Sequence, residues 1–223
     1  MVAQLWWMIS KDLITEYRAR RAWPAMLLLG VVVAVVFTVQ MGLLPEQKSQ
    51  ISGGLLWLAM FFAGLIAIDR SCASEKSDGC WDGLLAYPVS PSLVYWAKCV
   101  ASFLALLLLA GILIPVFVAL SGVDLLRPAW AIGLVAVLAC LGFSAVGTLL
   151  SALTNGIRQG GSLLALVLLP LTIPVVLAAA EATRLIAVGQ IGDEWWRWTQ
   201  LLGGFAVIYL TAGTILFDFV IED

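Results

Sequence analysis

The side chains that could do chemistry gather in one stretch of the sequence, from Asp69 to Asp82. It holds several carboxylates together with Cys72 and Cys80, which have seven residues between them. The stretch matches no metal-binding motif, and a zinc site would need two further ligands nearby. We therefore predict a solvated helix face carrying two ordinary thiols, with no bound metal.

Histidine is absent from the sequence. Its absence excludes a histidine general base, an HExxH zinc site and axial histidine ligation of haem by this chain. The sequence also lacks the GxxxxGK[ST] phosphate-binding loop, so the chain is not expected to hydrolyse ATP by itself. No constellation of acid, base and nucleophile is visible either. We predict that the chain is not an enzyme and assign it no bound cofactor.

The elements that hold these residues follow from a very apolar composition. Of the 223 residues, 62% are hydrophobic and 12% are charged, and the mean hydropathy is +1.04. Soluble domains are about 45–50% apolar and about 25% charged, so a freely soluble enzyme or nucleic-acid binder is excluded. The net charge of −2 likewise indicates no nucleic-acid partner. We predict an all-α integral membrane protein in the lipid bilayer.

Six apolar runs predict six transmembrane helices, because roughly 20 helical residues cross the hydrocarbon layer. None of the runs contains Asp, Glu, Lys or Arg. Ion-coupled transporters and hydrophilic channels normally carry ionisable groups at membrane depth, so both classes are disfavoured. The runs are Trp23–Leu44, Ile51–Ile68, Cys99–Ser121, Ala129–Ser151, Gly161–Ala180 and Gln200–Phe217.

Residues 1–22 precede the first run and are predicted to form an amphipathic helix in the headgroup region. Trp6, Ile9 and Leu13 fall on one side of that helix, and basic residues end it. The alternative is a positively charged flank to the first crossing. In both cases residues 23–223 form a six-helix transmembrane domain.

Lysine and arginine in the short connections predict the orientation, because cytoplasmic connections carry an excess of these residues. With a cytoplasmic N-terminus, eight basic residues lie inside and four lie outside. The inner set is Lys11, Arg18, Arg20, Arg21, Arg70, Lys76, Lys98 and Arg158, and the outer set is Lys48, Arg127, Arg184 and Arg197. We therefore predict that both termini are cytoplasmic.

The largest cytoplasmic connection is predicted at residues 69–98. Trp81, Leu84 and Leu85 are spaced for one face of a short helix, which the prolines that follow would stop. A short amphipathic helix between two crossings can bind a soluble partner and transmit the movement of that partner to the membrane helices. A solvated loop is the alternative, and the residues alone do not decide between the two.

The fifth run contains Pro170 and Pro174. Each proline removes a backbone donor and disturbs the carbonyl group one turn earlier, so this helix is predicted to be kinked or broken midway. Such a backbone is tolerated only where protein or a cavity covers it. Close helix packing is predicted in the fourth run, where Gly147 and Ser151 are four residues apart.

The connection after the fifth run is predicted to be the longest outer one, and it contains Trp195, Trp196 and Trp198. Tryptophan is enriched where membranes meet water, so an outer-leaflet aromatic belt is the prediction. An aromatic platform for a flat apolar ligand or for a partner helix stays open as the alternative.

Two strings of the sequence match a known family in order. They are Arg158-Gln159-Gly160-Gly161 and the Leu-Pro-Leu-Thr-Ile-Pro string that ends at Pro174. On these strings the chain resembles the haem exporter protein B (CcmB) family, the permease subunit of the cytochrome c maturation transporter and an ABC-2 type membrane subunit. The resemblance spans essentially the whole length, although beyond about residue 181 only a Trp-rich segment and a last crossing match. Supporting matches are Lys11-Asp12-Leu13, Glu16, Arg18, Gly54–Trp57, Glu75, Gly79, Leu84-Leu85, Pro88 and Lys98.

The resemblance implies a multi-pass ABC-2 permease in the bacterial inner membrane, with a separate ATPase subunit that binds ATP below it. In such permeases the connection between crossings two and three carries a coupling helix that docks on the ATPase. That role falls here on Glu75, Gly79, Trp81, Leu84 and Leu85. Other implied partners are a haem-handling membrane subunit, a small single-span subunit and a second copy of the chain.

The resemblance does not settle what the complex moves in support of covalent haem attachment to c-type cytochromes. Either haem crosses through the permease, or ATP hydrolysis releases a haem-loaded chaperone from the haem-handling subunit. The lack of histidine favours the second, although a Cys, Met or Tyr ligand or apolar contact could still hold haem. Two alternatives remain: an ABC-2 permease that exports a lipid, glycan or drug, and a membrane assembly factor without a transport cycle.

Overall fold

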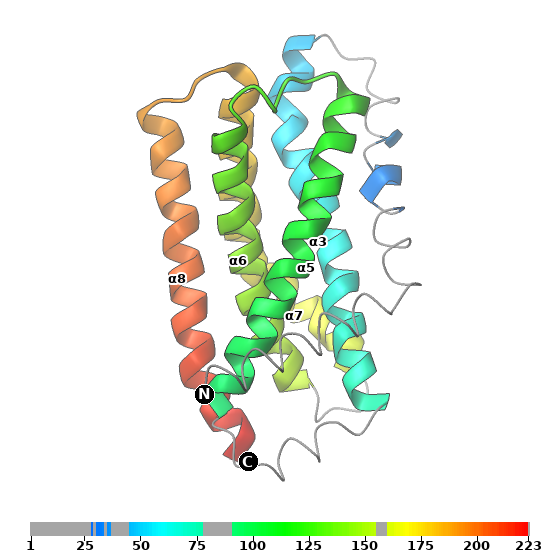
Figure 1. The fold of residues 1–223 in the computed structure, drawn as a ribbon, viewed down its shortest axis with the longest axis vertical. Coiled ribbons are helices and arrows are strands. Elements are labelled where there is room, and N and C mark those ends of the chain that lie inside the picture. Colours follow the sequence, from blue (N-terminus) through cyan, green and yellow to red (C-terminus); the bar gives the residue numbers. More distant parts are fainter. Residues whose placement is uncertain are drawn as a thin grey trace.

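The computed structural model describes residues 28, 30–33, 35–36, 45–77, 91–154 and 160–222. Five long α-helices account for nearly all of these residues, and the described part of the chain contains no strand (Figure 1). The helices are α3 (Pro45–Ser77), α5 (Pro91–Ser121), α6 (Ala129–Thr154), α7 (Gly160–Val188) and α8 (Asp193–Glu222). The all-α class predicted from the sequence is confirmed for this part of the chain.

All five helices are long and apolar enough to cross a bilayer. Even the shortest, α6, has 26 residues, whereas roughly 20 are needed. The apolar spans match predicted runs two to six, so the chain is a multi-pass membrane protein. The first run is described only in part, and residues 1–22 lie outside the described residues. The five spans are Gln47–Ile66, Ser92–Ser121, Ala129–Leu150, Leu169–Val188 and Asp193–Leu216.

The five helices alternate in direction, so their connections gather at two ends of the bundle (Figure 1). Residues 122–128 and 189–192 connect helices at the upper end, which is at the top of Figure 1. At the opposite, lower end, α3 and α6 finish and α5 and α7 begin. The connections predicted to be cytoplasmic therefore share the lower end, and those predicted to be outside share the upper end.

Glycines in the left-handed backbone region end α5 and α7 at the upper end. Gly122 has φ 70° and Gly189 has φ 78°, a conformation that glycine adopts without steric cost. At the end of α7 the Gly189 N–H donates to the Ile186 carbonyl at 3.0 Å, and the Gln190 N–H donates to the Leu185 carbonyl at 2.8 Å. This is the Schellman pattern, which satisfies the last carbonyls of a helix.

The predicted long outer connection after the fifth run is wrong. The helix α7 continues to Val188 and α8 begins at Asp193, which leaves only four residues between them. The Gly192 carbonyl already accepts a hydrogen bond from the Trp196 N–H at 3.1 Å. Acidic residues in the first turn, Asp193 and Glu194, interact favourably with the positive end of the helix dipole. The tryptophan-rich segment is therefore the first part of α8.

The connection expected at residues 69–98 is helical at both of its ends. The helix α3 continues to Ser77 and α5 starts at Pro91. No glycine or proline lies between Asp69 and Ser77, and proline suits the first position of a helix. Residues 69–77 and 91–98 therefore belong to helices, and residues 78–90 lie outside the described residues.

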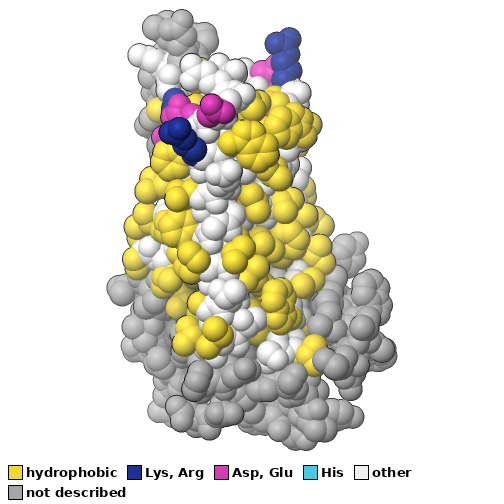
Figure 2. All heavy atoms as spheres, turned by 90° about the vertical axis from the view of Figure 1, so that its left-hand side faces the viewer, with side chains coloured by type: hydrophobic (Ala, Val, Ile, Leu, Met, Phe, Trp, Pro, Cys, Tyr) yellow, Lys and Arg dark blue, Asp and Glu magenta, His cyan; other side chains and the backbone are white. Residues whose placement is uncertain are grey.

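The helix α6 lies at the centre of the bundle, because it packs against each of the other four. Small residues on α6, such as Ala131, Ala139 and Ala145, are fully buried and let the neighbouring helices approach closely. Large apolar side chains are exposed on the outward faces, and Figure 2 shows them covering the middle of the molecule with charged side chains near the upper end. That apolar surface suits contact with lipid chains.

Candidate functional site

Of the predicted coupling residues, only Glu75 lies among the described residues. Glu75 lies in the last turn of α3. The other four, Gly79, Trp81, Leu84 and Leu85, lie outside the described residues. Because α3 ends and α5 begins at the lower end (Figure 1), the residues between them start and finish there. Their role in coupling stays a prediction.

The family motif is placed at the same end. Gly160 and Gly161 are the first two residues of α7, whereas Arg158 lies outside the described residues. The connection between α3 and α5 and the connection between α6 and α7 therefore both start and finish at the lower end. A soluble partner docked at this end could contact both.

One face of the first three turns of α5 is buried, and α5 packs against α6 and α8. Val94, Tyr95 and Cys99 are 5%, 0% and 2% exposed. The Tyr95 hydroxyl donates to the Ala145 carbonyl of α6 at 3.3 Å, and the Cys99 sulfur lies 3.5 Å from the Ser144 hydroxyl oxygen. Two polar contacts thus fix this end of α5 to α6.

The helix α7 is continuous from Gly160 to Val188 with Pro170 and Pro174 inside it, so it is not broken. Neighbouring hydroxyl groups bond to carbonyls in this region. Tyr209 of α8 donates to the Leu171 carbonyl at 2.6 Å. Membrane helices tolerate prolines where such groups satisfy the disturbed backbone. We call residues 170–174 the proline segment; its flexibility stays a prediction.

We expect Tyr209→Phe to lower the free energy of unfolding by about 0.6–1.7 kcal/mol, which are the mean and the maximum for interhelical hydrogen bonds in a membrane protein. The ring and its stacking on Phe205, at 6.0 Å between centroids, would remain, but the Leu171 carbonyl would lose a donor. Thr211→Val is the control, because the Thr211 hydroxyl bonds only to carbonyls of α8 itself among the described groups. Reversible unfolding in mixed micelles measures both variants, and equal stabilities for them would contradict the expectation.

An apolar groove of about 210 Å³ lies between α3 and α7 beside the proline segment. Phe61 is buried beneath it, whereas Phe62 and Ile173 are 40% and 46% exposed. The groove offers a ligand almost entirely carbon surface. Its lining residues are Leu58, Phe61, Phe62, Leu169, Thr172, Ile173, Val176 and Leu177.

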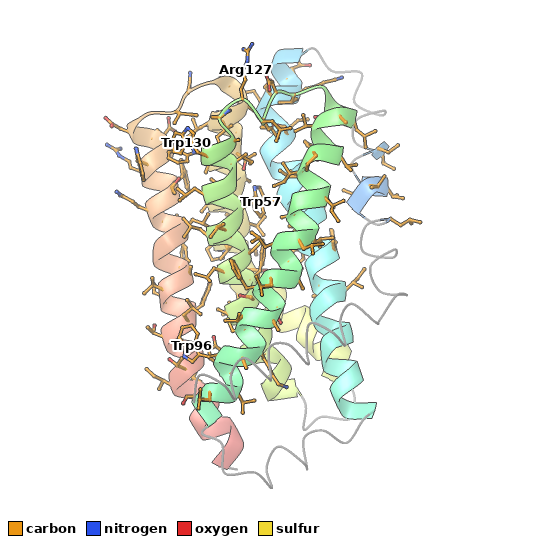
Figure 3. The ribbon with its side chains drawn as sticks, viewed as in Figure 1. Trp57, Trp96, Arg127 and Trp130 are labelled. Carbon is orange, nitrogen blue, oxygen red and sulfur yellow. The ribbon has the colours of Figure 1, made fainter. Side chains whose placement is uncertain are left out.

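The tryptophans near the upper end do not form a uniform belt. Trp195 is fully buried, whereas Trp196 is 49% exposed and Trp130 of α6 is 59% exposed. Edge-to-face contacts join Trp195 to Trp130 at 5.3 Å and to Trp196 at 5.1 Å between ring centroids. Figure 3 shows Trp130 near the upper end of α6. Trp195 is therefore a core residue that joins α8 to α6, and only its neighbours face outward.

Polar contacts between α3 and α7 were missed by sequence reasoning. The Trp57 indole N–H donates to the buried Thr183 hydroxyl at 2.8 Å. Arg184 pairs with Glu181 at 2.7 Å and donates to the Gln50 side chain at 3.1 Å. Polar side chains inside apolar helices indicate that hydrogen bonds are made, but sequence does not identify the partners.

Among the described side chains that could ligate a metal or haem iron, Cys99, Cys140 and Tyr95 lie inside the helix packing. Cys140 is fully buried and Cys99 nearly so, and Tyr95 is hydrogen-bonded to α6. Within the described residues, no group of three or more histidine, cysteine or acidic side chains comes together.

Comparison with known proteins shows the family of the chain. A family model described as CcmB protein matches residues 3–221. Heme exporter protein B of Rhodobacter capsulatus is 31% identical over 182 residues, which cover 82% of this chain and 83% of that protein. Heme exporter protein B of Pseudomonas aeruginosa is 28% identical, covering 79% and 78%, and that of Escherichia coli K12 is 29% identical, covering 68% and 68%. Because the family model takes in nearly every residue, the chain belongs to the CcmB protein family.

Proposed function

We propose that this chain is the membrane permease subunit of an ABC transporter complex required for c-type cytochrome biogenesis. The observation that carries the proposal is the CcmB family match over residues 3–221, supported by relatives named heme exporter protein B. The five spans supply the membrane domain. Since the sequence has no phosphate-binding loop, ATP hydrolysis falls to a separate subunit.

In this proposal the lower end faces the cytoplasm across the bacterial inner membrane, with both termini inside. The distribution of lysine and arginine supports this orientation. The ATPase subunit docks at the lower end, where Glu75 lies in the last turn of α3 and Gly160 and Gly161 begin α7. A haem-handling membrane subunit, a small single-span subunit and a second copy of the chain complete the assembly.

Hydrolysis by the ATPase would drive either haem export or release of a haem-loaded chaperone. The placement of Cys99, Cys140 and Tyr95 favours release, because these side chains are packed between helices rather than lining the groove. A haem path that uses one of them as iron ligand would need the helices to separate. Apolar contact alone could still carry haem along the bundle.

A deletion strain tests the proposed function. Cells lacking the chain should accumulate apocytochrome c without covalent haem and keep normal b-type cytochromes, and a plasmid copy should restore haem attachment. Intact c-type cytochromes in the deletion strain would instead favour export of a lipid, glycan or drug. Purification in mild detergent should recover the ATPase subunit with the chain, and its absence would favour an assembly factor without a transport cycle.

We expect Glu75→Ala and Trp81→Ala to leave membrane insertion intact but to uncouple ATP hydrolysis from cytochrome c maturation. The reason is the predicted docking of these residues on the ATPase. ATPase rate and holocytochrome c yield are measured on the same strains. Trp96→Ala is the control, because it removes a tryptophan of α5 near the lower end (Figure 3) that is not one of the predicted coupling residues. Normal holocytochrome levels in both test variants would refute the coupling role.

A further inference from the structure

The lower end of α5 is fitted closely to α8 as well as to α6. Gly213 of α8 faces the Tyr95 ring, and a Cβ atom added at Gly213 would overlap the Tyr95 hydroxyl and lie 2.9 Å from its Cε2. Tyr95 is fully buried, so its ring is enclosed by protein on all sides. Movement of α5 relative to α8 at this contact therefore requires that Tyr95 or the α8 backbone be displaced.

The same face of α8 also holds the proline segment of α7. Tyr209 lies four residues before Gly213, which is one helical turn and the same side of the helix. Its hydroxyl donates to the Leu171 carbonyl at 2.6 Å, between the two prolines. One face of α8 therefore contacts the lower end of α5 and the middle of α7.

The contact with α7 falls where that helix can change shape most readily. Pro170 and Pro174 lack the backbone N–H groups that would bond to Leu166 and Pro170. Residues 169, 172 and 173 of the same region line the apolar groove against α3. A change in the proline segment would therefore alter the groove.

We propose that α8 transmits displacement of the lower end of α5 to the proline segment of α7, through the Tyr95–Gly213 contact and the Tyr209–Leu171 hydrogen bond. Packed side chains and hydrogen bonds of this kind carry coupling between distant parts of a protein. The inference rests on the proposed function, in which an ATPase moves the lower end. Tyr95 and Tyr209 are positioning residues, and the apolar groove is the part whose shape they control.

Gly213→Ala tests the Tyr95–Gly213 contact. The added methyl group would push Tyr95 away from α8, so we expect holocytochrome c per assembled complex to fall by about two- to thirty-fold, the range for changes along a coupling network. Gly204→Ala is the matched control on α8, because it is exposed and has no atom within 4 Å of the added Cβ. It should keep the wild-type ratio.

A smaller side chain at position 95 combined with a larger one at position 213 tests whether the loss comes from the altered Tyr95–Gly213 contact or from general disruption of packing. Adding Tyr95→Leu to Gly213→Ala makes room for the methyl group but also removes the hydroxyl that donates to the Ala145 carbonyl. The double variant is therefore compared with Tyr95→Leu alone, and we expect Gly213→Ala to cause no further loss in that background.

Tyr209→Phe adds no volume and removes the Tyr209–Leu171 hydrogen bond. It should lower the ratio of holocytochrome c to assembled complex even if Gly213→Ala does not assemble. The inference would be overturned if holocytochrome c fell only in proportion to the amount of assembled complex. An unchanged ratio of holocytochrome c to assembled complex in Tyr209→Phe would also overturn it. If the wild-type chain itself binds no ATPase, the proposed function fails as well, in every variant alike.

Discussion

Gly53→Ala is expected to separate α3 from α7 and to leave little stably folded protein. A Cβ atom at Gly53 would overlap the Ala180 carbonyl oxygen and lie 2.9 Å from the Arg184 backbone nitrogen. Both are main-chain atoms inside α7, so no side-chain rotation can relieve the overlap. Overpacking usually costs about 1–3 kcal/mol. Because two whole helices must separate here, we expect a loss at or above about 3 kcal/mol.

The neighbouring glycine provides the control. Gly54 is exposed, and a Cβ atom there would meet nothing within 4 Å. Gly54→Ala should therefore be neutral or stabilise the protein by up to about 1 kcal/mol, because alanine favours helix more than glycine does. Thermal unfolding in one detergent, followed by helical circular dichroism, compares the two variants. A wild-type melting temperature for Gly53→Ala would contradict the close packing of α3 on α7.

The membrane class and five of the crossings could be predicted because the apolar runs themselves form the spans. The helix bounds could not, because hydropathy changes where side chains become polar rather than where the backbone stops being helical. Residues 69–77 are polar but contain no glycine or proline, and α3 continues through them. Within α7, Glu181 and Arg184 pair with each other and extend the helix beyond the apolar run.

The close helix contacts could not be predicted, because the residues that meet are far apart in the sequence. Spacing favoured Gly147 with Ser151, which stays a prediction. The structure describes close approaches at Gly53 and Gly213, whose partners lie more than 100 residues away. A small residue permits an approach, but the arrangement of the bundle decides which helix makes it. The coupling role of Glu75, Gly79, Trp81, Leu84 and Leu85 is likewise inferred by resemblance and stays a prediction.

Residue type alone did not predict the depth of the tryptophans. Trp195 and Trp196 are adjacent in sequence, yet only the first belongs to the core. The buried positions Trp195, Thr199 and Leu202 of α8 follow the helical period. That period would have placed Trp195 inside if the helix had been expected to begin at Asp193. The error in the helix boundary thus caused the error in burial.

Trp195→Ala is expected to remove about 3 kcal/mol from the free energy of unfolding. The side chain is fully buried, and its ring meets Trp130 and Trp196 edge to face. Truncating a buried tryptophan costs about 3–5 kcal/mol in soluble proteins. We expect the lower end of that range, because lipid outside the bundle is itself apolar and the loss comes mainly from the cavity.

Two further variants separate packing from polarity at this position. Trp196→Ala, at a 49% exposed ring, should cost well under half as much as Trp195→Ala. Trp195→Phe keeps an aromatic ring and removes an indole N–H that is buried without a hydrogen-bond partner among the described residues, so it should also cost less. Unfolding in mixed micelles measures all three. Equal losses for Trp195→Ala and Trp196→Ala would contradict the different burial of the two rings.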